Sequence, residues 1–293
     1  MPHIHWFRDR DSFTHAAEIA QVAIVQRDIP IAAAAFTRGH CPVCDRNTVF
    51  QVNTGATFAG RPNLREGLRC AHCGLTARQR LMLLALREEV DTLAMPLHGA
   101  MFEQTTRLYR MAHAQWRWLV GSEYLGEGLA GGKHYWWSTH WWRWRRTLHE
   151  SITALSYASL SLDLLVHSDV LEHVYDTRQA LRECARVLRP GGVMLFTVPF
   201  FADRLTSTLR GRLRRDGQIE HLEAPEYHGD GIARGGIYTF HNFGWDFFEL
   251  LRNSGFSRVE IGLCHSPDEG LSCSDPAGEQ TSRMLPLLFR AMK

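Results

Sequence analysis

Two short apolar runs, Leu162–Val166 and Val193–Val198, flank a stretch with helical periodicity. Between Thr177 and Leu188, apolar residues recur at the spacing that gives a helix one stripe for covering a sheet. These positions are Ala180, Leu181, Cys184, Val187 and Leu188. Asp176 can cap this helix, and Arg189-Pro190-Gly191-Gly192 ends it because proline cannot continue a helix and glycine accepts a positive φ. The order strand, helix, turn, strand predicts a βαβ unit with two parallel neighbouring strands.

The residues that carry this pattern resemble a known family. DLLVHSDVLEHV, LRECARVLRPGG and LFTVP are similar to the fourth strand, following helix and fifth strand of class I S-adenosylmethionine-dependent methyltransferases, closest to the type 11-like group. The resemblance implies an α/β fold, with a Rossmann-like doubly wound sheet of seven strands whose last strand is antiparallel. It also implies S-adenosylmethionine as the cofactor. Because one fold hosts many functions, it does not indicate the substrate.

The family pattern predicts where the remaining strands lie. Leu97–Phe102 and Arg117–Gly121 are the candidates for the first and second strands, and Val259–Leu263 is the candidate for the sixth. The tail Leu285–Met292 is expected to pair with Val259–Leu263 as the last strand. Residues 96–293 would then form the methyltransferase domain, with residues 200–244 as an insertion on the substrate side.

In the family, the first strand leads into an acidic residue and a Gly-x-Gly turn that approaches the methionine part of the cofactor. This chain has no such turn; Glu103 keeps the acid, and Thr105 or Thr106 stands where the glycines would be. Glu123, after the second strand, is expected to accept the two ribose hydroxyls, as carboxylates do in Rossmann-like sites. The alternative for Glu123 is a surface acid near a turn.

Two further groups of residues are expected to bind the cofactor. The resemblance places Glu150 or Ser151, with the backbone of Ile152, beside the adenine. His167, Ser168 and Asp169 follow the fourth strand, and ligands bind outside the carboxyl ends of strands in open α/β sheets. These three residues are therefore predicted to line the floor near the transferable methyl group.

The insertion is rich in histidine, tyrosine and aspartate, and substrate-recognition residues in the superfamily come from this place. His228, Asp230 and His241 are the predicted catalytic residues on the acceptor side. A histidine with a near-neutral pKa suits the general base that a hydroxyl acceptor needs. The alternative is that the two histidines are only exposed loop residues.

A second meaning is open for Asp169-x-x-Glu172-His173, because some methyltransferases hold Mg²⁺ with a similar set. A remote histidine would complete that site, and His221, His228 or His241 could supply it. The favoured alternative is that the motif is ordinary family framework.

Two Cys-x-x-Cys pairs precede the predicted domain, Cys41 with Cys44 and Cys70 with Cys73. Each pair presents two thiolates from a tight turn, and two pairs together give the four ligands of a structural Zn²⁺ ion. Residues 40–76 are therefore predicted to form a small zinc-ribbon-like module, with a redox pair or coincidental thiols as the alternative. Residues 1–39 are expected to be a helical leader and residues 77–95 a linker helix whose arginines, Arg78, Arg80 and Arg87, form a solvated face.

Composition limits the function further. The net charge is only +2, which argues against a nucleic-acid substrate. No apolar run is long enough to span a bilayer, the N-terminus is too polar for a signal peptide, and paired cysteines suit a reducing compartment, so we expect a cytoplasmic protein. The predicted function is methyl transfer to an oxygen of a small molecule or a sugar. The alternative is a cofactor-degenerate scaffold that binds a partner through the zinc ribbon and the Trp-rich segment 134–146.

Overall fold

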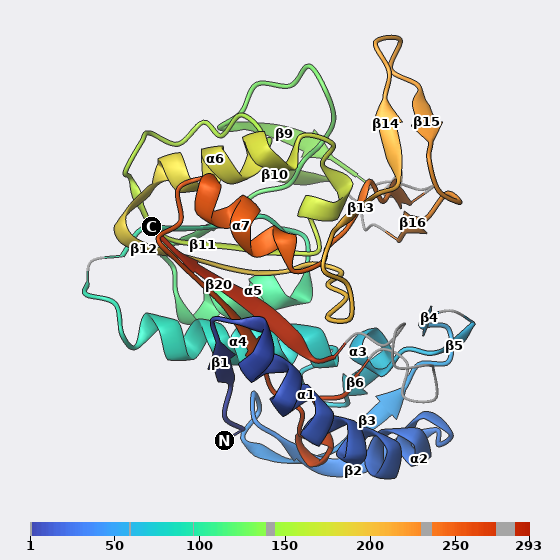
Figure 1. The fold of residues 1–293 in the computed structure, drawn as a ribbon. Coiled ribbons are helices and arrows are strands. Elements are labelled where there is room, and N and C mark those ends of the chain that lie inside the picture. The colour runs from blue at the N-terminus through green and yellow to red at the C-terminus, as the bar shows by residue number, and fades with distance from the viewer. Residues whose placement is uncertain (1, 59, 96, 139–143, 230–235, 274–284) are drawn as a thin grey trace. The chain divides into compact units, whose positions relative to one another are not determined.

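The computed structural model describes residues 2–58, 60–95, 97–138, 144–229, 236–273 and 285–293 (Figure 1). Its main sheet has seven strands in the order β1-β19-β20-β12-β11-β7-β8. In that order the strands are His5–Phe7, Arg258–Leu263, Leu287–Met292, Leu188–Thr197, Leu162–Ser168, Gly99–Met101 and Leu119–Gly121. Strands β8, β7, β11 and β12 pair in parallel, whereas β1 pairs antiparallel with β19. The predicted α/β, Rossmann-like seven-stranded sheet is confirmed.

The membership of the sheet differs from the prediction at both ends. Strand β1 comes from the leader that was expected to be helical only. Residues 148–155, whose sequence resembles the end of the family's third strand, overlap only the end of β10 (Arg145–His149), which pairs antiparallel with β9 (Lys133–Trp137). A bridge between His149 and Glu123 joins β10 to the segment that follows β8. The first two residues of β10 are exposed and the last three are buried, so only its end is covered as an internal strand would be.

The chain divides into two compact units. Unit 1 comprises residues 1–93, 201–203 and 260–290, and unit 2 comprises residues 94–200, 204–259 and 291–293. The helices that begin in unit 1 are α1 (Arg10–Ala23), the π-helix η1 (Ile24–Asp28), α2 (Ile29–Ala32), α3 (Leu64–Gly67), α4 (Ala77–Val90) and the 3₁₀ helix η3 (Pro267–Glu269). Those of unit 2 are α5 (Arg107–Gln115), the 3₁₀ helix η2 (Leu171–His173), α6 (Thr177–Val187) and α7 (Asp246–Asn253). Within the described ranges, every helix is too short or too polar to cross a bilayer.

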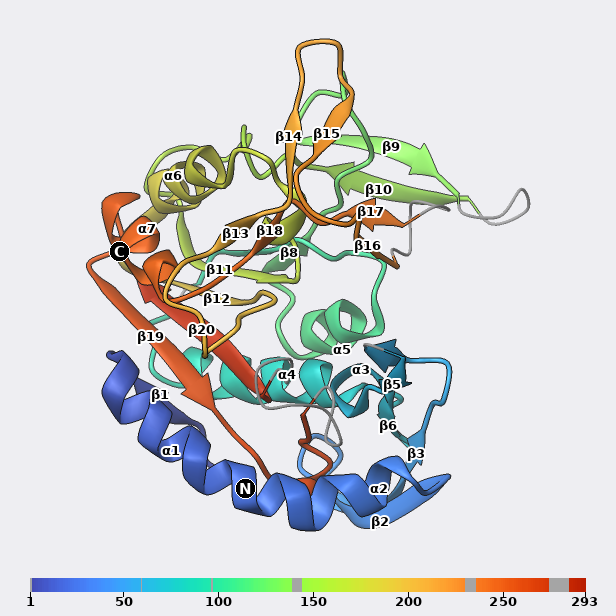
Figure 2. The same ribbon diagram turned by 45° about the vertical axis from the view of Figure 1, so that its right-hand side comes forward.

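In unit 2, helices cover both faces of the parallel strands. Helices α6 and α7 lie on one face and α5 lies on the other (Figures 1 and 2). Phe196 of β12 packs edge-to-face on Phe247 of α7, with ring centroids 6.0 Å apart. Asp176 caps α6 as predicted, since its carboxylate accepts a hydrogen bond of 3.0 Å from the backbone of Gln179. The strands are therefore buried on both sides, as near-continuous apolar runs require.

The predicted turn after α6 takes a different form, because β12 begins directly at Leu188. Leu162 pairs with Leu188 and Leu164 with Val193, so the Pro-Gly-Gly residues form an irregularity inside the strand rather than a loop before it. Gly191 has a φ of 79°, which a residue without a side chain adopts at little cost. The parallel pairing of the two strands is as predicted.

The insertion 200–244 folds into short antiparallel strand pairs. The pairs are β13 (Thr208–Leu209) with β18 (His241–Asn242), β14 (Gly211–Leu213) with β15 (Ile219–His221), and β16 (Tyr227–His228) with β17 (Ile237–Tyr238). Strands β14 and β15 form an extended arm in both views (Figures 1 and 2). The backbone of Glu172 in η2 accepts a hydrogen bond of 2.7 Å from Phe240, which ties the insertion to the end of β11.

Unit 1 contains a three-stranded sheet followed by α4. The sheet consists of β2 (Phe36–Cys41), β3 (Arg46–Val52) and β6 (Leu68–Cys70), and a separate short pair is formed by β4 (Thr57–Phe58) and β5 (Arg61–Pro62). Helix α4 starts with a capping box in which Thr76 and Gln79 exchange hydrogen bonds.

The predicted solvated face of α4 is wrong at Arg80, whose side chain is fully buried. Its guanidinium lies over the ring of Phe50 and donates to the backbone oxygens of Leu68, Leu75 and Gly270. A helical register alone could not reveal this, because one of the carbonyl groups, that of Gly270, comes from a segment far away in the sequence.

We expect Arg80→Met to lower the free energy of unfolding by roughly 3 kcal/mol, because it leaves three buried carbonyl groups without a donor. Arg78→Met on the same helix is the matched control. Arg78 pairs with the part-exposed Glu66, so its loss should cost less than about 1 kcal/mol. Urea denaturation followed by circular dichroism measures both, and equal losses would contradict the assignment.

Candidate functional site

The order of the parallel strands reverses between β7 and β11, which is where open α/β sheets bind ligands. Glu103 follows β7, and Ser168 ends β11. The hydroxyl of Ser168 donates a hydrogen bond of 2.8 Å to the carboxylate of Glu103, which is 7% exposed. Two predicted cofactor residues are thus in direct contact across the point of reversal.

Glu123 lies at the end of the neighbouring strand β8 and shapes the turn after β7. One of its carboxylate oxygens accepts hydrogen bonds of 2.7 Å from both the backbone N–H and the hydroxyl of Thr105. The hydroxyl of Thr106 then caps α5 by accepting from the backbone of Tyr109 at 3.0 Å. The turn that lacks glycine is therefore held by a carboxylate and a helix cap.

The predicted adenine residues lie directly beside Glu123. The backbone N–H of Glu150 donates to the carbonyl of Glu123 at 3.1 Å. The buried carboxylate of Glu150 accepts from the backbone and the hydroxyl of Ser156, so it closes the loop 151–156. Ser151 bonds Thr153, and Ile152 is buried. The carboxylate of Glu150 therefore holds the loop in shape.

His167 and Asp169 occupy different surroundings from Ser168. His167 is fully buried between the rings of Phe102 and Phe196, and burial lowers its pKa to about 3. Asp169 adopts a φ of 50°, and its carboxylate accepts a hydrogen bond of 2.8 Å from the hydroxyl of Thr197. Of the three residues predicted to line the floor, His167 has the surroundings of a core side chain.

A second cluster gathers around the fully buried carboxylate of Glu172. Its ligand-type atoms and those of His173 and His228 all lie within 4.8 Å of one another. The sequence had grouped Glu172 and His173 with Asp169, but the structure gives their third neighbour as His228, one of the three remote histidines. Asp169 bonds Thr197 instead.

The surroundings of the catalytic candidates differ. Burial lowers the pKa of His228, but the nearby carboxylates of Glu172 and Glu226 outweigh burial and raise it to about 9. His241 donates to the carbonyl of Tyr175 at 3.1 Å, and burial lowers its pKa. Asp230 lies outside the described residues. Glu226 is not among the sequence-predicted site residues, although its spacing of two from His228 places both residues on one face of an extended segment.

In unit 1 the four paired cysteines converge. The sulfur atoms of Cys41 and Cys73 are 3.9 Å apart, and those of Cys44 and Cys70 are 3.8 Å apart. All four sulfur atoms lie within 4.8 Å of one another, and none forms a disulfide. The Cys73 thiol donates to Cys41, which lowers the pKa of Cys41 to about 4.

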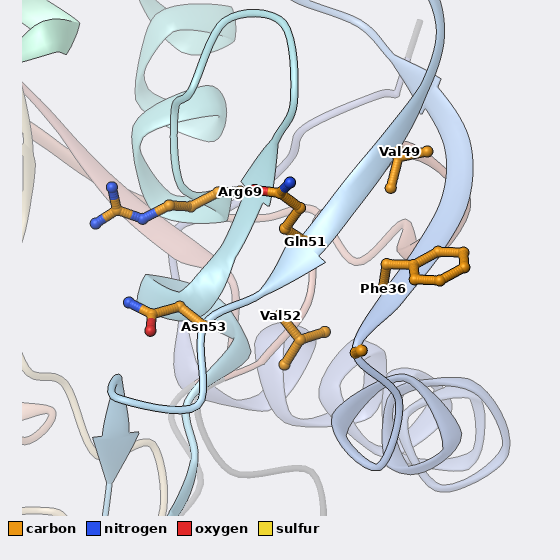
Figure 3. Close-up of a pocket in the computed structure, with 7 residues that line it drawn as sticks. Phe36, Val49, Gln51, Val52, Asn53 and Arg69 are labelled. Carbon is orange, nitrogen blue, oxygen red and sulfur yellow. The ribbon is translucent and has the colours of Figure 1, made fainter.

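A hollow of about 610 Å³ lies beside the three-stranded sheet of unit 1 (Figure 3). Its lining consists of Ala35, Phe36, Val49, Gln51, Val52, Asn53 and Arg69. None of these residues belongs to a predicted site. The lining offers no carboxylate, thiol or imidazole, so it lacks groups for acid–base chemistry or metal binding.

Comparison with known proteins identifies similarity to methyltransferases. A model of the methyltransferase domain matches residues 135–196. A probable S-adenosylmethionine-dependent methyltransferase of Mycobacterium tuberculosis is 28% identical over 121 residues, which is 41% of this chain and 36% of that protein. A second one, of Mycolicibacterium smegmatis, is 43% identical over 51 residues, or 17% of this chain and 20% of that protein. The chain thus spans about a third or less of the length of these curated relatives.

Among solved structures, an S-adenosylmethionine-dependent methyltransferase from Mesorhizobium loti is similar to this chain, with 20% identity and a TM-score of 0.43. The similarity covers 73% of this chain and 98% of that one.

The buried His167 predicts a pH dependence of stability. The imidazole of His167 has a pKa of about 6.5 in the unfolded chain and about 3 in the folded chain. Between these two pH values, the unfolded chain binds a proton at His167 that the folded chain does not bind. The contribution of His167 to stability is therefore complete above pH 6.5 and is lost as the pH falls, by about 1.4 kcal/mol per pH unit.

We expect His167→Phe to reduce the slope of the unfolding free energy against pH between pH 4 and 6 by the contribution of one proton, about 1.4 kcal/mol per pH unit. The reason is that a phenyl ring between the two phenylalanines does not titrate. Urea denaturation at several pH values measures the slope. The exposed His134 provides the control His134→Phe, and an unchanged slope in His167→Phe would contradict the burial argument.

Proposed function

We propose that this chain is an S-adenosylmethionine-dependent methyltransferase. The observation that carries the proposal is the hydrogen bond between Glu103 and Ser168 at the reversal of strand order, with Glu123 at the end of the adjacent strand. The methyltransferase-domain match over residues 135–196 includes β10, β11 and α6 and so supports the same part of the chain.

The residues present fit the polar parts of the cofactor. Glu123 offers carboxylate oxygens for two ribose hydroxyls, and Thr105 holds that carboxylate in place. Glu103 and Ser168 face the methionine end, where a carboxylate and a hydroxyl suit an ammonium group. The loop of Ser151 and Ile152, closed by Glu150, lies next to Glu123 and is our proposed adenine contact. Bound S-adenosylmethionine supplies an electrophilic methyl group on sulfur.

We propose a hydroxyl of a small molecule or sugar as the acceptor, with His241 as its general base. The carbonyl of Tyr175 can only accept, so Nε2 of His241 carries the hydrogen and Nδ1 is the basic atom. Burial lowers the pKa of His241, so the ring is neutral at pH 7 and able to take a proton. Asp230 remains a candidate in the same insertion. The methyltransferase names of the relatives favour an enzyme over a cofactor-free scaffold.

Replacing Glu123 tests the cofactor site. We expect Glu123→Ala to weaken binding of S-adenosylhomocysteine by 10- to 100-fold, about 1.4–2.7 kcal/mol, because the ribose loses its acceptor and the Thr105 turn loses its anchor. Isothermal titration calorimetry measures this loss. Glu220→Ala removes an exposed carboxylate and should bind like the wild type. Absence of binding by the wild-type protein would sink the proposal.

We further propose that the four cysteines of unit 1 hold a structural Zn²⁺ ion. A tetrahedral zinc site with Zn–S bonds of about 2.3 Å requires sulfur–sulfur distances of about 3.8 Å, close to the two values found here. The guanidinium of Arg80 is buried with these four cysteines and supplies positive charge next to an anionic centre. Arg87 adds donors toward the carbonyl groups of Pro42 and Val43 in the first Cys-x-x-Cys turn.

Zinc analysis tests this site. We expect about one zinc per chain in the wild-type protein, and loss of zinc with a lower melting temperature in Cys70→Ser, because a structural metal contributes its binding energy to folding. Cys184→Ser removes a buried cysteine far from the cluster in sequence and should keep the metal. A zinc-free wild-type protein with an unchanged melting curve in chelator would refute the metal site.

A further inference from the structure

Glu172 is an unusual carboxylate, because burial normally requires a hydrogen-bonded or charged partner. Its side chain is 0% exposed, and among the described residues neither of its oxygens has a hydrogen-bond donor. Two imidazole nitrogen atoms, Nε2 of His173 and Nδ1 of His228, each lie 3.7 Å from Oε1. That separation is too long for a hydrogen bond.

The hydrogen bond that His173 makes away from Glu172 determines which of its ring nitrogens carries a lone pair. Its Nδ1 lies 2.9 Å from the carbonyl oxygen of Tyr238. A carbonyl can only accept, so Nδ1 must carry the hydrogen. In the neutral ring, Nε2 then presents its lone pair toward Glu172.

His228 is also held by a hydrogen bond on one ring nitrogen, but here Nε2 makes that bond and Nδ1 faces Glu172. Its Nε2 lies 3.0 Å from a carboxylate oxygen of Glu226 and donates to it. The Nδ1 lone pair then faces Glu172, and the two imidazole rings meet edge-to-face with centroids 5.1 Å apart. Histidines that bind metals are held in this way, by a carboxylate or carbonyl on the nitrogen away from the ion.

When both rings are neutral and Glu172 is ionised, as metal binding requires, three sets of lone pairs converge. We propose that Glu172, His173 Nε2 and His228 Nδ1 bind one divalent transition-metal ion, with Glu226 and the Tyr238 carbonyl positioning the two rings. Two imidazoles and one carboxylate suit Mn²⁺, Fe²⁺, Co²⁺ or Zn²⁺ better than Mg²⁺, which prefers oxygen ligands. The ligand set thus departs from the magnesium site of Asp169, Glu172 and His173, which the sequence left open as a less favoured alternative.

Three protein ligands leave coordination positions open, as in sites where a metal binds a substrate. Glu172 is fully buried, but the side chain of His228 is 33% exposed, so solvent reaches one side of the cluster. This part of the inference rests on the proposed function: the ion would bind the oxygen of a hydroxyl-bearing acceptor and make its proton easier to remove.

Manganese titration tests the site, with the zinc of the cysteine cluster left in place because Mn²⁺ has little affinity for thiolates. Electron paramagnetic resonance follows the loss of the free Mn²⁺ signal. We expect one Mn²⁺ per chain for the wild-type protein and at least tenfold weaker binding for Glu172→Gln and for His228→Ala. His134→Ala removes an exposed histidine and should bind Mn²⁺ as the wild type does.

Two outcomes overturn the inference: no Mn²⁺ binding by the wild-type protein, or binding that neither Glu172→Gln nor His228→Ala weakens. The first outcome would leave His228 as a protonated partner of Glu172 and Glu226. Calorimetry with S-adenosylhomocysteine on the same proteins separates this inference from the proposed function. If the wild-type protein binds Mn²⁺ but not S-adenosylhomocysteine, the metal site stands and only its link to methyl transfer fails.

Discussion

The parallel pairing of β7, β11 and β12 determines where the candidate side chains of unit 2 lie. Parallel strands bring their carboxyl ends to one edge of the sheet. Glu103, Ser168 and Asp169 meet there although Glu103 is distant in sequence from the other two. A shift of one residue in the register of β11 would turn Ser168 away from Glu103.

The carboxylates near this edge differ in whether they accept hydrogen bonds from the protein. Glu103, Glu123 and Glu150 each accept hydrogen bonds from nearby hydroxyls or backbone N–H groups. Their positions are thus determined by the protein itself. Glu172 is the more buried group and has two imidazoles in place of donors. Because an unpaired buried charge is costly, this contrast separates carboxylates that shape the proposed cofactor site from one that is suited to a cation.

Unit 1 also contains a buried charged side chain, that of Arg80. Arg80 has no carboxylate partner among its hydrogen bonds, which all go to backbone oxygens, and burial lowers its pKa while the cysteines raise it. The attraction between the buried guanidinium and the cysteine group partly offsets the cost of burying the charge. Arg80, which the helical pattern placed on a solvated face, is therefore needed in the interior as the donor to these backbone oxygens.

The sequence by itself determined the features that depend on neighbours along the chain. The βαβ unit, the Asp176 cap and the spacing of the two Cys-x-x-Cys pairs all follow from local periodicity and turn chemistry. Glu103 and Glu123 could be proposed because each directly follows a strand.

Only the tertiary structure decided which distant groups meet. It placed β1 at the sheet edge, buried Arg80 and His167, and brought His228 to Glu172 in place of Asp169. These outcomes depend on backbone groups and side chains contributed by remote segments, such as the carbonyl groups of Gly270 and Tyr238. A linear pattern records the types of such residues but not the distances between them, and burial and hydrogen bonding depend on those distances.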